Sequence, residues 1–196
     1  AFERAGLRVR YFSASTMDPW VDLVGVPRPV ERPDGSTVLQ LVRLAEFEDD
    51  AVDAVFLDEF NRAPAKVRNA AMELLQFRSV NGRRFTNLRL VWAAVNPADD
   101  DQVYDVEPLD PAQADRFHVH LEIPYRPCDH YFASRYGPSG IAAVEWWTQL
   151  SESARKLVSP RRLETAIQVF EQGGSLRDVI PEKAGTARLH RLLLEG

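Results

Sequence analysis

Apolar and polar positions predict strands alternating with helices over the first two thirds of the chain. Residues 8–15 alternate in the two-residue period of a strand, and residues 53–60 hold a short apolar run that ends in two acids. Such a run is typical of a strand buried on both faces. Residues 90–95 form another apolar run, and residues 117–124 alternate again. We therefore expect four strands in these places.

Helices are predicted from spacings of three and four residues. Residues 65–77 follow Pro64, a residue suited to a helix's first turn, and bring Val67, Ala71 and Leu74 or Leu75 to one face. A short helical piece is expected at 111–116. Beyond residue 126 helical patterns stand alone, at 127–137, 139–150, 159–174 and 186–195.

Two hairpins are expected between these elements. Four prolines and the pair Asp34-Gly35 lie between residues 17 and 44, which argues against a helix and for a hairpin returning from Val38 to Leu44. A second hairpin is predicted around Asn81-Gly82. Strands alternating with helices, then helices alone, indicate a three-layer α/β unit over residues 1–126 and a small all-α unit over residues 127–196.

Composition narrows the class of protein. With 45% hydrophobic and 27% charged residues the chain has the make-up of a globular protein, and its net charge of −5 disfavours nucleic acid and anionic membranes as partners. The lone Cys128 excludes an internal disulfide framework. No apolar run approaches the roughly 20 residues that span a bilayer, and the first residues lack a signal-peptide pattern, so we expect a cytoplasmic protein.

Asp58 and Glu59 are the main candidates for chemistry. A strand that delivers two acids at its carboxyl end places them where open α/β sheets bind ligands. Phosphoryl transfer needs one carboxylate to hold Mg²⁺ and a neighbouring group to orient the attacking water. Asp58 suits the first role and Glu59 the second. The alternative is a solvated acid pair, since short matches of this kind are common.

Two further candidates follow along the chain. Asn96 ends the strand expected beside that of Asp58, where its amide could bind water or a γ-phosphate, although Asn-Pro after a strand is also a plain turn signal. Arg116 could stabilise charge on a transferring phosphate, or simply pair with Asp115.

The stretch FLDEFNRAP resembles the segment that carries the Walker B acids in MoxR-like AAA+ ATPases, and AAVNP, QADRF and SPRR follow in that family's order. The resemblance implies a P-loop NTPase-type αβα core with a helical lid, binding ATP and Mg²⁺. It also implies that Asn96 is the sensor 1 residue, that Arg116 is an arginine finger acting on the next subunit, and that Arg161 is the sensor 2 arginine. Arg162 is adjacent to Arg161, so the sensor 2 assignment stays open between them, as does whether it acts within one subunit.

The resemblance also bears on the hairpins. In similar proteins such hairpins project toward a ring's pore, so Arg83 and Arg84 could touch a substrate polypeptide; a solvated hairpin tip is the alternative. His118 and His120 would share a strand face, but a metal site needs more converging ligands than these two. Trp146 and Trp147 are interpreted as core of the lid.

The glycine-rich phosphate loop GxxxxGK[ST] of the family does not occur in this sequence. In the family it precedes a strand like residues 8–15, so we expect it upstream of Ala1. Without it these 196 residues alone should bind ATP poorly and hydrolyse none.

The function expected from the resemblance is an ATP-hydrolysing, chaperone-like ring ATPase, a hexamer, that remodels a protein partner. A von Willebrand A domain protein is the partner that the resemblance implies. Two alternatives remain: a catalytically inactive scaffold on the same fold, and a metal-dependent hydrolase that uses the acid pair directly.

Overall fold

The computed structural model of this chain describes residues 2–42, 52–96 and 108–195. The chain forms two compact units, Ala1–His120 and Leu121–Gly196. The boundary predicted between residues 126 and 127 falls in the stretch 121–128, which is neither helix nor strand.

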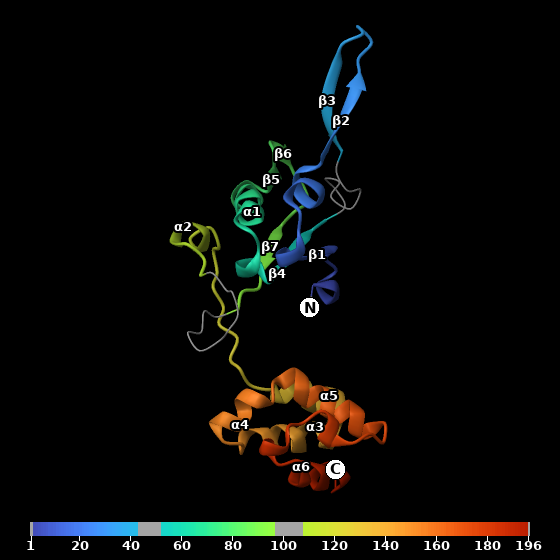
Figure 1. The fold of residues 1–196 in the computed structure, drawn as a ribbon, viewed down its shortest axis with the longest axis vertical. Helices are drawn as coiled ribbons and strands as arrows, with labels where there is room; N and C mark the ends of the chain where they lie inside the picture. Colours follow the sequence, from blue (N-terminus) through green and yellow to red (C-terminus); the bar gives the residue numbers. More distant parts are fainter. Residues whose placement is uncertain (1, 43–51, 97–107, 196) are drawn as a thin grey trace. The chain divides into compact units, whose positions relative to one another are not determined.

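The first unit contains the strands and two helices (Figure 1). The strands are β1 Val9–Ser13, β2 Val26–Glu31, β3 Thr37–Val42, β4 Ala54–Asp58, β5 Ser79–Val80, β6 Arg83–Arg84 and β7 Leu90–Ala93. The helices are α1 Ala65–Phe77 and α2 Pro111–Ala114, with short 3₁₀ turns at Glu3–Ala5, Ala14–Thr16 and Phe60–Arg62 and a π-helical turn at Trp20–Val24.

The described part of the second unit consists of helices and connecting turns. Its helices are α3 Asp129–Thr148, α4 Glu152–Leu157, α5 Pro160–Glu171 and α6 Thr186–Glu195, with 3₁₀ turns at Leu176–Asp178 and Glu182–Ala184. Together the two units confirm the predicted fold class, an α/β unit followed by an all-α unit.

The central sheet has the order β1-β4-β7, and both pairings are parallel. In this register Ser13 lies opposite Asp58, and Leu57 lies opposite Ala93. The carboxyl ends of the three strands therefore meet at one edge of the sheet, as predicted for the strand that carries the acids.

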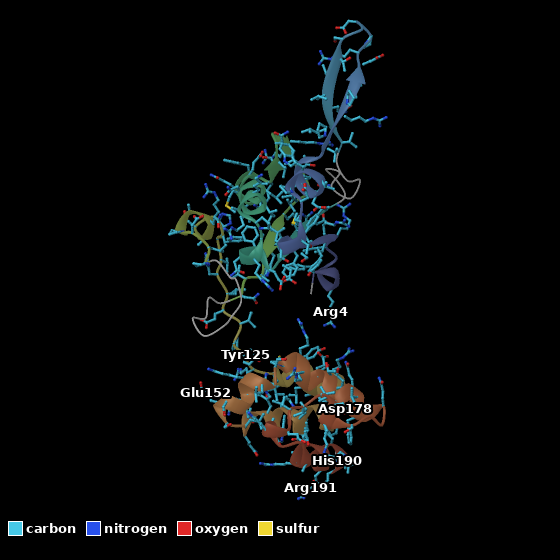
Figure 2. The ribbon with its side chains drawn as sticks, viewed as in Figure 1. Arg4, Tyr125, Glu152, Asp178, His190 and Arg191 are labelled. Atoms are coloured by element: carbon cyan, nitrogen blue, oxygen red, sulfur yellow. The ribbon has the colours of Figure 1, made fainter. Side chains whose placement is uncertain are left out.

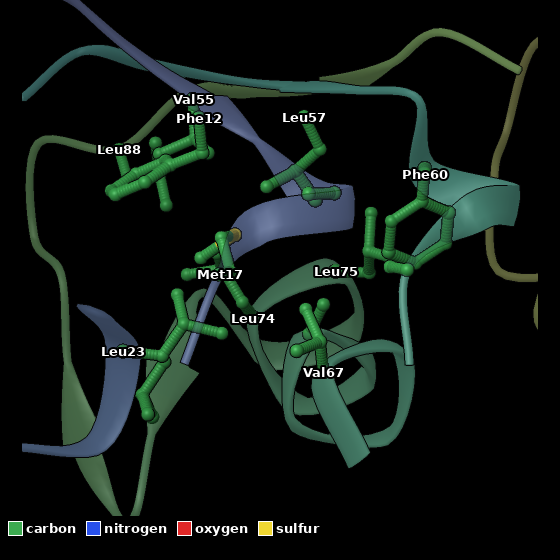
Figure 3. Packing of buried hydrophobic residues seen from close by; sticks show 14 of the residues in the cluster. Phe12, Met17, Leu23, Val55, Leu57, Phe60, Val67, Leu74, Leu75 and Leu88 are labelled. Carbon is green, nitrogen blue, oxygen red and sulfur yellow. The ribbon is translucent and has the colours of Figure 1, made fainter. Parts of the chain in front are cut away.

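One face of this sheet packs on α1 to form the core of the first unit (Figure 3). Phe12 and Leu57 reach into it from β1 and β4, and Val67 and Leu74 come from α1; each is at most 7% exposed. Ala71 and Leu75 are buried as well. The face of α1 that the spacing of apolar residues predicted to be buried is therefore confirmed.

The opposite face carries a row of aromatic rings. Tyr11, Phe56 and Trp92 lie side by side on the three strands, because the register pairs Tyr11 with Phe56 and Phe56 with Trp92. Phe2 packs on this row, with ring centroids 6.3 Å from Phe56 and 5.9 Å from Trp92. Tyr11 remains 54% exposed and Trp92 37% exposed.

Both predicted hairpins form. Strands β2 and β3 pair antiparallel around the turn that contains Gly35, and this hairpin extends away from the sheet (Figure 1). The turn between β5 and β6 places Asn81 and Gly82 at positive φ, 51° and 73°, which is why this residue pair favours a tight hairpin.

The Glu73 side chain on α1 holds the second hairpin. One carboxylate oxygen accepts hydrogen bonds from the Ser79 hydroxyl at 2.7 Å and the Gly82 N–H at 3.0 Å. The other accepts one from the Asn81 N–H at 2.7 Å. The turn is thus tied to the helix that directly follows the acid pair.

The strand predicted over residues 117–124 does not form. A strand is stabilised by pairing with a neighbour, and these residues pair with no strand of the described chain. Val119, Leu121 and Ile123 are 70%, 61% and 80% exposed. The alternation of apolar and polar residues was therefore not enough to predict a strand over residues 117–124.

The second unit has its own core, and Trp146 and Trp147 are buried in it as predicted. The Trp147 indole N–H donates to the Val158 carbonyl at 2.7 Å. The two helices predicted over 127–137 and 139–150 are merged in α3, with a break at Gly137, whose φ of 56° and ψ of −134° are not helical. Helix α4, which begins at the capping residue Ser151, was not predicted.

Charged side chains cover the surface of the second unit, among them Glu152 on α4 and Arg191 on α6 (Figure 2). In the described residues of both units, no helix has the length and apolar character needed to cross a membrane.

Candidate functional site at the carboxyl edge of the sheet

Asp58 is the last residue of β4 and is held from the neighbouring strand. Its Oδ2 accepts a hydrogen bond from the Tyr11 hydroxyl at 2.8 Å, and its Oδ1 accepts one from the Glu59 N–H at 3.0 Å. The hydrogen bond to this carboxylate, helped by burial and the nearby negative charges, raises the pKa of Tyr11. Tyr11 therefore remains a proton donor to Asp58 at neutral pH.

Glu59 adopts a left-handed backbone conformation, with φ 52° and ψ 39°, which ends the strand and turns the chain. Its Oε2 accepts a hydrogen bond from the Ser15 hydroxyl at 3.0 Å. Its Oε1 accepts one from Arg62 Nη1 at 2.9 Å, in an ion pair whose side chains are 36% and 37% exposed. Arg62 thus contacts a candidate catalytic residue.

Asn96 lies beside the acid pair, just past the end of β7. The Phe60 N–H donates to the Ala94 carbonyl at 2.9 Å, which joins the chain after Glu59 to the chain after β7. The residue after Phe60, Asn61, bonds the Asn96 backbone through both ends of its side-chain amide. Three predicted site residues, Asp58, Glu59 and Asn96, therefore meet at one edge of the sheet.

Arg116 lies elsewhere in the same unit. Its Nε donates to Gln76 Oε1 at 3.4 Å, and its Nη1 donates to the Ala112 carbonyl at 2.5 Å. Gln76 is near the end of α1, whereas the acid pair precedes the start of this helix. Neither of these hydrogen bonds joins Arg116 to the acid pair of its own unit, although the next residue, Phe117, packs on Phe60 with ring centroids 5.9 Å apart.

Two shallow pockets lie near the end of α1. One of about 470 Å³ borders the hairpin β5–β6. The other, of about 320 Å³, is lined by Leu75, Gln76, Ala112, Asp115, Arg116 and His118.

Arg161 and Arg162 belong to the second unit, in the first turn of α5. The Ser159 hydroxyl caps this helix by accepting from the Arg162 N–H at 3.1 Å, and Arg162 Nη1 donates to the Leu157 carbonyl at 2.9 Å. Arg161 and Arg162 are both exposed, and the hydrogen bond made by the Arg162 side chain is internal to its unit.

The remaining candidate residues are those of the hairpin β5–β6 and the two histidines that follow Arg116. Arg83 and Arg84 are exposed on β6. His118 and His120 do not share a strand face, because no strand forms there, and in the described ranges no three histidine, cysteine or acidic side chains gather as metal ligands. The expectation that these histidines bind no metal remains untested.

The residues at the sheet edge suit Mg²⁺ in one respect. Mg²⁺ prefers hard oxygen ligands and usually takes one or two protein carboxylates, with waters and substrate phosphates completing its shell. Asp58 offers such a carboxylate at the end of a parallel strand, with both oxygens oriented by hydrogen bonds from Tyr11 and the Glu59 main chain. A single oriented aspartate is what a metal bound chiefly through a nucleotide requires.

Three contacting residues were missed by sequence reasoning: Tyr11, Ser15 and Asn61. Their partners are 47, 44 and 35 positions away along the chain. Asn61 had one signal, its place within the stretch FLDEFNRAP, but nothing local indicates what its side chain would bind.

A parallel sheet with an acid pair and an asparagine at its carboxyl edge, followed by a helical unit, is the arrangement that the resemblance to AAA+ ATPases implies. A 72-residue segment, 35% of this chain, is 44% identical to "Chaperone MoxR1" of Mycobacterium tuberculosis. The resemblance to MoxR-like AAA+ ATPases is thereby confirmed.

The extent of these similarities is limited. The matched segment spans 18% of the mycobacterial chaperone. A solved structure of a candidate ATPase from Cytophaga hutchinsonii is 19% identical, with a TM-score of 0.41, over 96% of this chain and 63% of that one. That similarity is too low to support the fold. No protein-family model matches the chain.

Proposed function

We propose that the intact protein that carries this chain hydrolyses ATP with Mg²⁺ and uses the energy to remodel a protein partner. The observation that carries the proposal is the meeting of Asp58, Glu59 and Asn96 at one sheet edge. In this proposal Asp58 holds the metal, Glu59 polarises the attacking water and Asn96 positions it. The phosphate cradle is contributed by residues outside this sequence.

Arg116 acts on a neighbouring subunit in the proposed ring, a hexamer. Its hydrogen bonds go to Gln76 and to the Ala112 carbonyl and not to the acid pair of the same unit, which supports this. Arg161 contacts phosphate from the helical unit. A von Willebrand A domain protein is the proposed partner, on the resemblance alone.

Glu59 is held by two hydrogen bonds, which leave a second lone pair on each carboxylate oxygen. Both of its carboxylate oxygens accept hydrogen bonds, from Ser15 and Arg62. The contact with Arg62 is half exposed, so solvent screens it and its cost of breaking is small. We propose that Glu59 exchanges Arg62 for the attacking water when nucleotide is bound.

The test is Mg²⁺-dependent ATP hydrolysis by the full-length protein, beside Glu59→Gln and Arg116→Ala. Each substitution should abolish turnover, because a hydrolytic carboxylate or a transition-state cation is lost. Glu145→Gln, at an exposed acid on α3, is the matched control and should hydrolyse ATP at the wild-type rate. If the full-length protein neither binds nor hydrolyses ATP, the protein is better described as an inactive scaffold on this fold.

Mixing the two inactive variants tests the proposed action between subunits. In rings mixed at equal amounts, about one quarter of interfaces join an intact Glu59 to an intact Arg116 of the neighbour. Activity should therefore reappear on mixing. Were both residues to act within one subunit, no mixture would restore it.

A further inference from the structure

Asn61 stands at the point where the main chains of β4 and β7 separate. The Ala94 N–H donates to the Leu57 carbonyl and the Phe60 N–H to the Ala94 carbonyl, both at 2.9 Å. Glu59 then turns the chain into the 3₁₀ turn Phe60–Arg62. Beyond this point the backbone after β4 no longer runs along the backbone after β7.

The Asn61 side chain makes the two hydrogen bonds to the chain after β7 that a paired strand residue would make through its backbone. Its Nδ2 donates to the Asn96 carbonyl at 2.8 Å, and its Oδ1 accepts from the Asn96 N–H at 3.1 Å. A primary amide has the donor and acceptor of a peptide group, so it replaces a strand residue in pairing. Asn61 is only 3% exposed, so its end of both bonds is shielded from water.

Asn61 is itself held by α1. Arg68, which is 8% exposed, donates from Nη1 to the Asn61 carbonyl at 3.3 Å. The residue is therefore fixed on its backbone side by the helix and on its side-chain side by Asn96. Asn96 by contrast is exposed and lies three residues beyond the end of β7 at Ala93.

These contacts fix the backbone from which the Asn96 side chain projects. With its N–H and its carbonyl both bonded to Asn61, the backbone at this residue has one orientation relative to the acid pair. Resting on the proposed function, we infer that Asn61 is a positioning residue: it orients Asn96 toward the attacking water by replacing the missing main-chain partner. Asn61 does not touch the reacting atoms in this account.

Steady-state ATP hydrolysis by the full-length protein tests the inference through a double-mutant cycle. Asn61→Ala should lower kcat at least about fivefold, the effect of losing two buried hydrogen bonds, with KM changed less than about twofold. In an Asn96→Ala background the same substitution should lower kcat no further, because the group that it positions is gone. Equal losses in both backgrounds would show a general structural effect and overturn the inference.

A second variant keeps one of the two bonds. Asn61→Asp is isosteric and keeps the acceptor for the Asn96 N–H, but it places an oxygen against the Asn96 carbonyl. It should lower kcat in the same way, and its thermal unfolding midpoint should lie at or below that of Asn61→Ala, because a buried carboxylate then faces a carbonyl. Wild-type kcat in both variants would overturn the inference.

Hydrogen exchange at the Asn96 amide separates this inference from the ATPase proposal. In Asn61→Ala that amide should exchange at least about fivefold faster than in the wild type, since its acceptor is lost. The Ala94 amide, which donates to Leu57, is the internal control and should keep its protection. Unchanged exchange at Asn96 overturns the positioning role even if ATP is hydrolysed. Faster exchange in a protein without ATPase activity refutes the proposed function and leaves the link between Asn61 and Asn96 standing.

Discussion

Replacing Glu73 with glutamine should loosen the hairpin β5–β6 while leaving the α/β unit folded. The carboxylate accepts hydrogen bonds from the main chain of Asn81 and Gly82 and from the hydroxyl of Ser79. Glutamine keeps one acceptor oxygen and turns the other into a donor, which then faces the N–H groups of the turn. The substitution thus removes acceptors without changing the shape of the side chain.

The expected magnitude follows from the kind and exposure of these bonds. Hydrogen bonds to a charged acceptor contribute about 1.5–3 kcal/mol each when shielded from water. The main-chain donors at Asn81 and Gly82 are exposed, so solvent weakens these bonds and we expect a smaller total, about 1–2 kcal/mol for opening of the turn. This corresponds to an increase of about 5- to 30-fold in the population of the open hairpin.

Amide hydrogen exchange of the full-length protein measures this opening. The Asn81 and Gly82 amides should exchange about 5- to 30-fold faster in Glu73→Gln than in the wild type, and faster again in Glu73→Ala. Glu145→Gln, on an exposed face of α3, is the matched control and should leave both amides unchanged.

Two outcomes would refute this reasoning. Wild-type exchange at both amides in Glu73→Gln would show that the carboxylate does not hold the turn. Equal acceleration throughout α1 would show that the substitution destabilises the helix instead of releasing the hairpin.

Further predictions concern stability. Hydrogen bonds from Arg8 lower the pKa of Asp53 to about 2, so this stabilisation is present above about pH 4, its unfolded pKa, and is lost as the pH falls toward 2. The difference in unfolding free energy between wild type and Asp53→Asn should shrink across that window in urea titrations; a constant difference would contradict it. Trp147→Phe should cost about 1–3 kcal/mol, because the buried carbonyl that follows α4 loses its donor. Leu163→Ala should cost about 2–5 kcal/mol in urea unfolding, against little change for the exposed Leu194→Ala.

Much of the local structure could be predicted from patterns within a few residues. The apolar run before Asp58 indicated a buried strand, and the spacing from Val67 to Leu75 indicated the buried side of α1. Asn81-Gly82 indicated its hairpin. In each case the signal is short-ranged, because a strand's alternation, a helix's period and a turn's positive φ are properties of neighbouring residues.

The strand predicted over 117–124 shows that a local pattern alone does not determine whether a strand forms. Its alternation matches a half-buried strand, but a strand is stable only beside a partner, and partners are supplied by tertiary structure. Within the described residues no strand pairs with residues 117–124, and Ile123 is 80% exposed.

The candidate site was likewise predicted in part from the sequence, while the rest depended on the tertiary structure. Sequence alone indicated Asp58, Glu59 and Asn96, because each follows an apolar run and polar residues at strand ends collect at one edge of a parallel sheet. Only the tertiary structure decided what holds them. The bond from Asn61 to Asn96 joins residues 35 positions apart, and its partners become neighbours only once β4 and β7 pair. Hydrogen bonds act over about 3 Å in space, and no pattern along the chain records which distant residues will come that close.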